Sequence, residues 1–133
     1  GWDNAATGGD GDYTCGVKMH KGDDGLFYVT DSKRGQWNTA DRDREKRQAA
    51  ELDGRNVKHI GEQEPGSGGK EAAENFIRLF AGFSVAVEKV SGSKELRADP
   101  FSSQVNAGNV RLLRGDWNRD YINYGIIFLE VNF

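Results

Sequence analysis

The fold of this chain is decided by the stretch Val57-Lys58-His59-Ile60-Gly61-Glu62-Gln63-Glu64-Pro65-Gly66-Ser67-Gly68-Gly69-Lys70. Its pattern predicts a short strand (57–61), then two carboxylates, a glycine-rich turn and the start of a helix. A strand end is where a sheet presents side chains to solvent and ligand, and two acids placed there are costly unless a cation binds them. We therefore interpret Glu62 as one wall of a divalent-metal site and expect Asp3 to form the other wall.

Length and composition limit the class of protein. The chain has 133 residues, enough for one domain with a buried core and too few for two. Three Trp, four Tyr and seven Phe supply bulky core side chains, although the hydrophobic fraction is only 36%. Cys15 is the single cysteine, which fits a reducing compartment. Without a signal-peptide pattern or an apolar run near the roughly 20 residues of a membrane span, we expect a soluble cytoplasmic domain.

The charge distribution suggests an acidic pocket beside a basic surface. The net charge of −3 argues against a protein that grips nucleic acid by bulk charge alone. Acids dominate residues 1–32, whereas basic residues concentrate in 33–58 and reappear after residue 88. A metal-dependent phosphodiester enzyme would have this arrangement, and an ordinary surface of mixed charge explains it equally well.

The rest of the pattern predicts strands and helices in alternation. Expected strands lie at 2–6, 13–19, 26–32, 57–61 and 83–87, and expected helices at 41–52 and 70–81. Beyond residue 91 we expect a helical turn that Pro100 interrupts, a helix at 100–107, a strand at 110–113, a helical turn at 117–121 and a β-prone end at 125–133. Asn38 or Thr39 should cap the first helix and Gly54 should end it. The second helix has an apolar stripe of Ala73, Phe76, Ile77 and Phe80.

The order of these elements predicts an α/β fold. Three strands joined by short turns should be antiparallel, and the later strands, reached through helices, should be parallel. A mixed sheet of this kind, flanked by helices, matches a ribonuclease H-like fold. In that layout the fourth strand lies beside the first, so that Asp3 and Glu62 become neighbours.

Several segments resemble the C-terminal nuclease domain of phage terminase large subunits. They are Gly1-Trp2-Asp3-Asn4-Ala5-Ala6-Thr7, Gly11-Asp12-Tyr13-Thr14, Glu62-Gln63-Glu64-Pro65-Gly66-Ser67-Gly68-Gly69-Lys70, Ser93-Lys94-Glu95-Leu96-Arg97-Ala98, Gly108-Asn109-Val110 and Gly115-Asp116-Trp117. The resemblance covers residues 1–122, as a single ribonuclease H-like domain, and leaves 123–133 as a divergent β-prone tail.

The resemblance implies a viral DNA-packaging endonuclease. Such a domain cuts concatemeric double-stranded DNA with two Mg²⁺ or Mn²⁺ ions held by clustered acids. Asp3 matches the strand-one aspartate of the family and Glu62 its strand-four acid. The family's third acid lies downstream of the resemblance, where 124–133 departs from the pattern. The implied partners are double-stranded DNA and the terminase ATPase domain, small subunit and portal, and the implied location is the host cytoplasm, with no membrane.

Other acids are weaker candidates for the site. Glu64 is either a supporting residue or a solvated turn residue, and Asp12 either binds metal or caps a turn. Asp116 and Asp120 are the available substitutes for the third acid. For Asp3 itself, the alternative to a metal ligand is an acid in a turn at the strand end.

The glycine-rich turn is not a nucleotide-binding loop. Glu64 replaces the first glycine that such a loop requires, and Glu71 stands where Ser or Thr should bind Mg²⁺. The glycines instead allow a tight turn, and the helix that follows could meet a DNA phosphate. Lys94 and Arg97 are the candidates for DNA-backbone contacts, or they form an exposed helical face without a partner.

The sequence alone leaves three functions open. The first is a metal-dependent DNA endonuclease, and the second is a catalytically silent DNA-binding or motor-docking fragment that lacks the third acid. The third is another ribonuclease H-like enzyme such as a resolvase, against which the Glu62–Lys70 block counts.

Overall fold

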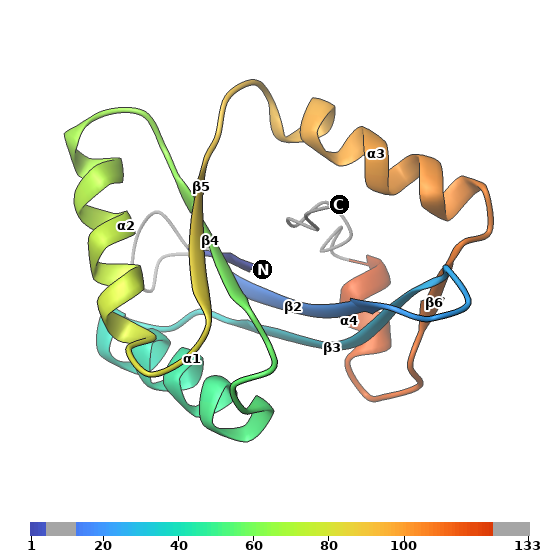
Figure 1. Ribbon diagram of the computed structural model, residues 1–133, viewed down its shortest axis with the longest axis horizontal. Helices are drawn as coiled ribbons and strands as arrows, with labels where there is room; N and C mark the ends of the chain where they lie inside the picture. Colours follow the sequence, from blue (N-terminus) through green and yellow to red (C-terminus); the bar gives the residue numbers. More distant parts are fainter. Residues whose placement is uncertain (5–12, 124–133) are drawn as a thin grey trace. The chain divides into compact units, whose positions relative to one another are not determined.

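The computed structural model describes residues 1–4 and 13–123, apart from the side chains of Lys94 and Glu95. It has a mixed α/β fold (Figure 1). The elements in chain order are β1 (Trp2–Asp3), β2 (Thr14–Lys21), β3 (Phe27–Gly35), α1 (Thr39–Asp53), β4 (His59–Gln63), α2 (Ser67–Leu79), β5 (Val85–Lys89), α3 (Lys94–Asn106), β6 (Val110–Leu112) and α4 (Asn118–Asn123). The predicted alternation of strands and helices is therefore confirmed, while the expected β-prone end at 125–133 lies outside the described residues.

The chain forms two compact units. Among the described residues, the first contains Gly1, Cys15–Arg34 and 92–123, and the second contains 2–4, 13–14 and Gly35–Ser91. Among the described helices, none is long and apolar enough to cross a membrane.

The first unit is built on a sheet in which β2, β3 and β6 are successive neighbours. A tight turn joins β2 to β3, where Gly22 N donates to Leu26 O across 2.8 Å, so these two strands run antiparallel as predicted. β6 pairs with β3 in parallel register, with Val29 opposite Leu112. The core of this unit contains Cys15, Val17, Val29 and Tyr121. Burial raises the pKa of Tyr121 to about 12.

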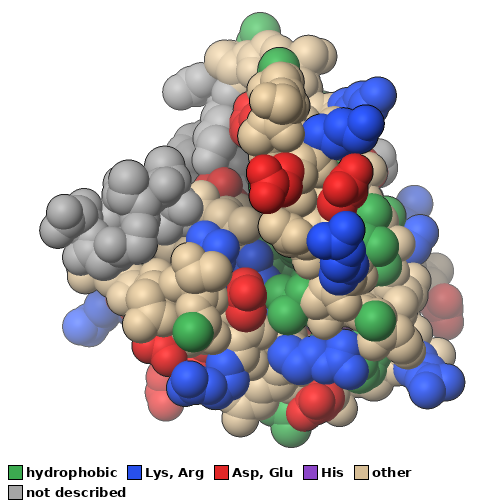
Figure 2. Space-filling model, turned by 90° about the vertical axis from the view of Figure 1, so that its left-hand side faces the viewer, with side chains coloured by type: hydrophobic (Ala, Val, Ile, Leu, Met, Phe, Trp, Pro, Cys, Tyr) green, Lys and Arg blue, Asp and Glu red, His purple; other side chains and the backbone are tan. Residues whose placement is uncertain are grey.

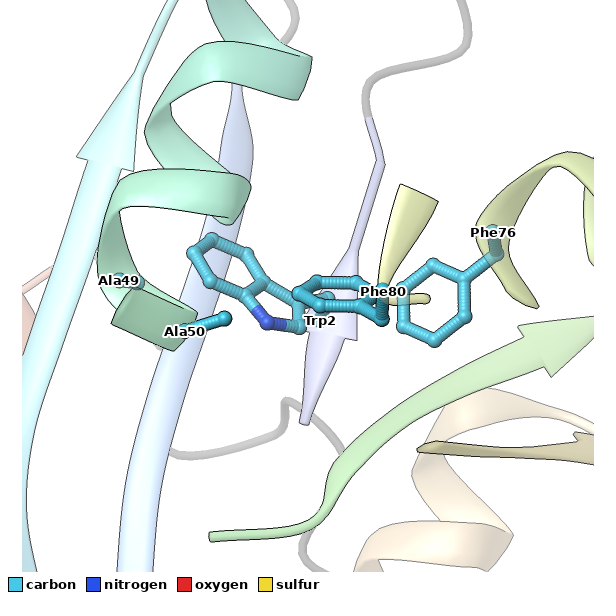
Figure 3. Close-up of a cluster of buried hydrophobic side chains, with 5 residues drawn as sticks. All are labelled: Trp2, Ala49, Ala50, Phe76 and Phe80. Carbon is cyan, nitrogen blue, oxygen red and sulfur yellow. The ribbon is translucent and has the colours of Figure 1, made fainter. Parts of the chain in front are cut away.

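The second unit contains both walls of the expected site. β4 and β5 form a parallel pair from His59 opposite Val85 to Gln63 opposite Lys89. Helix α2 packs on both strands, and β1 lies beside β4. Trp2 fills the core of this unit together with Ala49, Ala50, Phe76 and Phe80 (Figure 3). Burying Trp2 therefore holds the chain segment that carries Asp3.

Helix α1 is capped as predicted and buries an unusual face. Asn38 caps it by accepting a hydrogen bond of 2.8 Å from Asp41 N, and Gly54, with φ 78°, ends it. Its buried residues are Lys46, Ala49 and Ala50, so a lysine stands where an apolar side chain is expected.

Arg47 of α1 ties the two helices of the second unit together. It donates to the carbonyls of Leu79 and Ala81 at 3.0 and 2.8 Å, and its guanidinium lies 4.8 Å from the Phe83 ring centroid. The Leu79 carbonyl ends α2 and the Ala81 carbonyl lies just beyond it, where a cation is favourable.

Expectations about element boundaries, and about one buried side chain, were wrong. The fourth strand includes Glu62 and Gln63, because its extent follows its hydrogen-bonded partner β5, not its hydrophobic residues. The second helix begins at Ser67 instead of Lys70, and Ile77, expected in its apolar stripe, is 48% exposed.

Pro100 does not interrupt the third helix. Helix α3 runs unbroken from Lys94 to Asn106, with Pro100 inside it. Ser93 caps its start by accepting a hydrogen bond from Leu96 N, and the buried side chains of Ala98 and Phe101 flank the proline. Packing on both sides of Pro100 outweighs its local cost to the helix.

Candidate functional site

Asp3 is held at the end of β1 by its two neighbours. Trp2, on one side, is 8% exposed, and its indole Nε1–H donates across 3.3 Å to Nδ1 of His59 on β4. Asn4, on the other side, accepts a hydrogen bond from the ammonium group of Lys46. Asp3 itself is half-buried. The carboxylate therefore projects from a segment that is fixed before and after it.

Glu62 is positioned by the strand on which it lies. His59 and Gly61 of β4 are buried, and Glu62 is half-buried with its Oε1 atom shielded from solvent. The ring of Phe76 would lie 3.0 Å from a Cβ at position 61, so glycine is what lets α2 pack this closely beside Glu62. His59 stacks on Phe80 with ring centroids 4.4 Å apart, which fixes the other end of the strand.

The two residues predicted to form the site, Asp3 and Glu62, lie in the same compact unit. Asp3 and Glu62 are 59 positions apart in sequence, but β1 lies beside β4. The sheet also places a third acid that the sequence reasoning missed, because Glu88 of β5 is the register partner of Glu62. Partners in neighbouring strands share a face of the sheet, and like charges placed opposite each other destabilise it. Aligning the two predicted strands in parallel register would have found Glu88.

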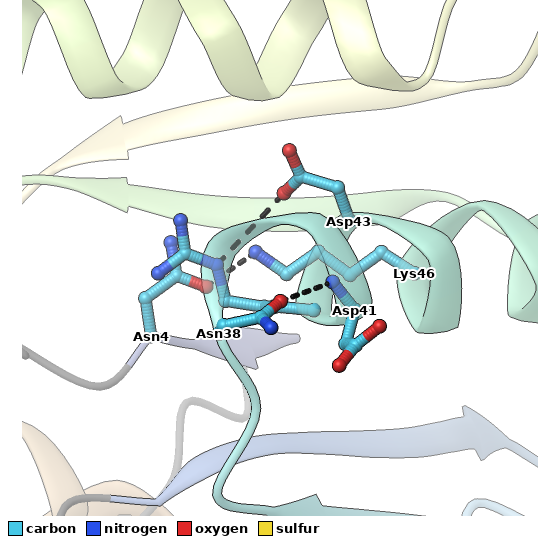
Figure 4. A network of polar contacts seen from close by, with 6 residues as sticks. Asn4, Asn38, Asp41, Asp43 and Lys46 are labelled. Carbon is cyan, nitrogen blue, oxygen red and sulfur yellow. Dashed lines mark hydrogen bonds and ion pairs between the residues drawn. The ribbon is translucent and has the colours of Figure 1, made fainter. Parts of the chain in front are cut away.

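A buried lysine lies beside Asp3, and the sequence reasoning missed this residue too. Lys46 is 2% exposed and extends from α1 toward Asn4 (Figure 4). Burial, reinforced by the charge of Arg42, lowers the pKa of Lys46 to about 8, while Asp43 and Asp3 act in the opposite direction. The sequence did carry a signal: Lys46 lies three and four residues before Ala49 and Ala50, at the spacing of one face of a helix.

The turn after β4 is as tight as predicted. Gly66 has φ 99°, in the left-handed region that favours glycine. A Cβ at Gly69 would lie 1.9 Å from the carbonyl oxygen of Glu64, so the first turn of α2 lies directly against the turn. No side chain of the described residues caps the start of α2. Glu64 is exposed, and nothing in its surroundings assigns it a supporting role.

The remaining predicted site residues lie elsewhere or outside the described parts. Asp116, Asp120 and Arg97 belong to the first unit. Asp116 and Asp120 are exposed, and Arg97 is half-buried with its Nε shielded from solvent. Asp12 lies outside the described residues, and for Lys94 the structure describes the backbone at the start of α3 but not the side chain.

The oxygen ligands of Asp3 and Glu62 fit a hard divalent cation such as Mg²⁺. Within residues 1–4 and 13–123, however, no group of three or more His, Cys, Asp or Glu side chains is arranged to hold a metal ion. On the face shown in Figure 2, basic and acidic side chains are interspersed.

A comparison with protein families matches residues 1–124 to a family described as the terminase RNaseH-like domain. The matched range covers most of the chain and extends slightly beyond the expected residues 1–122. Searches of curated proteins and of solved structures returned no match.

Proposed function

The chain belongs to the terminase RNaseH-like domain family, a nuclease-type domain, and from this we propose that it is a metal-dependent endonuclease that cuts concatemeric double-stranded DNA during viral packaging. The observation that carries the proposal is that Asp3 and Glu62 lie on neighbouring strands of one unit. The ribonuclease H-like strand order is part of the same proposal; among the described residues, β4 pairs with β5 in a two-stranded sheet.

Asp3 and Glu62 would hold the cations, either Mg²⁺ or Mn²⁺. Two such ions supply an activated water and stabilise the leaving oxygen of a phosphodiester. The carboxylates of Asp3 and Glu62 provide hard oxygen ligands. The strands that carry them, β1 and β4, are held in place by buried neighbours. A bound cation would also relieve the repulsion between Glu62 and its register partner Glu88. Glu88 joins Asp116 and Asp120 as a candidate for the third acid.

Lys94 and Arg97 are proposed to contact the DNA backbone, because both lie in the first two turns of α3. Phosphate contacts of this kind position a duplex without reading its sequence. We propose that the ATPase domain, small subunit and portal of the packaging motor are the protein partners, and that the domain acts in the host cytoplasm.

A catalytically silent DNA-binding or motor-docking fragment is the second candidate. It is favoured by the absence of a three-acid group among the described residues. Membership in the terminase family favours both candidates over a resolvase.

The test is cleavage of supercoiled plasmid by the domain in Mn²⁺, with EDTA as the metal-free control. Asp3→Ala and Glu62→Ala should abolish cleavage, because each removes an oxygen ligand. The matched control is Glu74→Ala, which removes an exposed acid of α2 and should leave cleavage unchanged. Cleavage that survives Asp3→Ala would refute the assigned site. Retained DNA binding without any cleavage would favour the silent fragment.

A further inference from the structure

Lys46 is the least expected residue of the second unit. It is 2% exposed, although lysine is almost never fully buried without a partner. Its neighbours on the buried face of α1 are two alanines, so the helix could bury an apolar side chain there at lower cost. A buried charge that does not improve the core calls for another explanation.

The contacts of Lys46 converge on the two residues that flank Asp3. Its ammonium group donates a hydrogen bond to Oδ1 of Asn4 and lies 5.8 Å from the ring centroid of Trp2. It also lies 5.3 Å from the ring centroid of Phe76, on the helix that packs against β4. One side chain therefore contacts the residues immediately before and immediately after Asp3.

We propose that Lys46 is a positioning residue, which holds Asp3 in place through Asn4 and Trp2. The inference concerns the geometry of β1 and rests on the proposed function only where metal binding is measured. A loosened β1 leaves Asp3 in many orientations, and binding a cation must then order it again. Partners that orient a ligand in this way typically change metal affinity by about 10- to 100-fold.

The alternative is that Lys46 acts only through its charge, and it predicts the opposite result. A cation close to the acids repels an incoming metal ion, so removing it should tighten metal binding. If Lys46 positions Asp3, removing it should weaken metal binding. The sign of the change in affinity therefore separates the two explanations.

The experiment compares the complete 133-residue chain with three variants. Lys46→Met keeps the length of the side chain and removes its charge. Asn4→Ala removes the hydrogen-bond acceptor from an exposed residue and leaves the core intact. Arg44→Met is the matched control, because it removes a charge from an exposed position of the same helix.

The first measurement needs no metal. Backbone order parameters of residues 2–4, measured by NMR relaxation, should fall from about 0.85 toward about 0.6 in Lys46→Met and Asn4→Ala. They should stay unchanged in Arg44→Met. The melting temperature of Lys46→Met should be maintained or raised, because a buried charge is replaced by an apolar side chain. A residue that serves only the stability of the core would instead lower it.

The second measurement is Mn²⁺ affinity by titration calorimetry. We expect affinity to fall about tenfold in Lys46→Met and in Asn4→Ala, and not in Arg44→Met. Tighter Mn²⁺ binding by Lys46→Met, or unchanged order parameters at residues 2–4 in both variants, would overturn the proposal. If the unmodified chain binds no Mn²⁺, the proposed metal site fails, and the order parameters alone decide the role of Lys46.

Discussion

The indole Nε1–H of Trp2 donates a hydrogen bond of 3.3 Å to Nδ1 of His59. This bond joins β1 to β4, the two strands that carry Asp3 and Glu62. It requires His59 to accept at Nδ1, and the stacking of His59 on Phe80 holds the imidazole in the orientation that does so. Trp2 and His59 therefore belong to the buried core and also connect the two strands that carry the candidate site.

Trp2→Phe should destabilise the second unit. The substitution removes the donor to His59 and leaves a buried acceptor without it, which typically costs about 1–3 kcal/mol. Urea unfolding should show this loss in the free energy of unfolding. Trp37→Phe, at a half-buried indole outside this hydrogen bond, should cost less. Equal losses in the two variants would show that the hydrogen bond has no particular role.

Lys46 should make stability rise at alkaline pH. Its pKa falls from 10.5 to about 8 on folding, so between these values the unfolded chain binds a proton that the folded chain has released. The unfolding free energy should therefore increase with pH across this window, by roughly 3 kcal/mol if the full shift is realised. Subtracting the same pH profile of Lys46→Met isolates this group from other titrating residues. A difference profile that is flat above pH 8 would contradict the prediction.

Adjacent glycines at the start of α2 should respond in opposite ways to alanine. At Gly69 a Cβ would meet the carbonyl oxygen of Glu64 at 1.9 Å, so Gly69→Ala should cost about 1–3 kcal/mol. At Gly68 a Cβ meets nothing within 4 Å, so Gly68→Ala should stabilise the helix by up to about 1 kcal/mol. Thermal unfolding of the pair measures both effects. If both variants changed the melting temperature in the same direction, the first turn of α2 would not lie against the turn as the structure shows.

Pro100→Ala should stabilise the first unit. Pro100 is exposed inside α3, where it lacks a backbone N–H to donate to the preceding turn. Replacing it should gain up to about 3 kcal/mol, the penalty of proline in a helix interior. Circular dichroism during urea unfolding is the measurement. A loss of stability would show that the proline shapes α3 for its packing.

Much of the fold could be predicted from the sequence, because strand and helix signals are local. The caps at Asn38 and Gly54 and the tight turn between β2 and β3 depend on residues within a few positions of each other. The family was recognisable for a similar reason, since its motifs are short runs in a set order. The boundaries of β4 and the continuity of α3 were not predictable, because both depend on packing against distant residues.

The sequence by itself determined the alternation of elements and the family, and it singled out Asp3 and Glu62 as candidate metal ligands. Only the tertiary structure decided what surrounds these acids, because contacts between residues far apart in the chain depend on how strands and helices pack. Parallel register sets Glu88 opposite Glu62. The packing of α1 against β1 brings Lys46 to Asn4, and the contact of β1 with β4 pairs Trp2 with His59. A lysine in a helix is usually solvated, and only its burial between Trp2 and Phe76 turns Lys46 into a candidate part of the site.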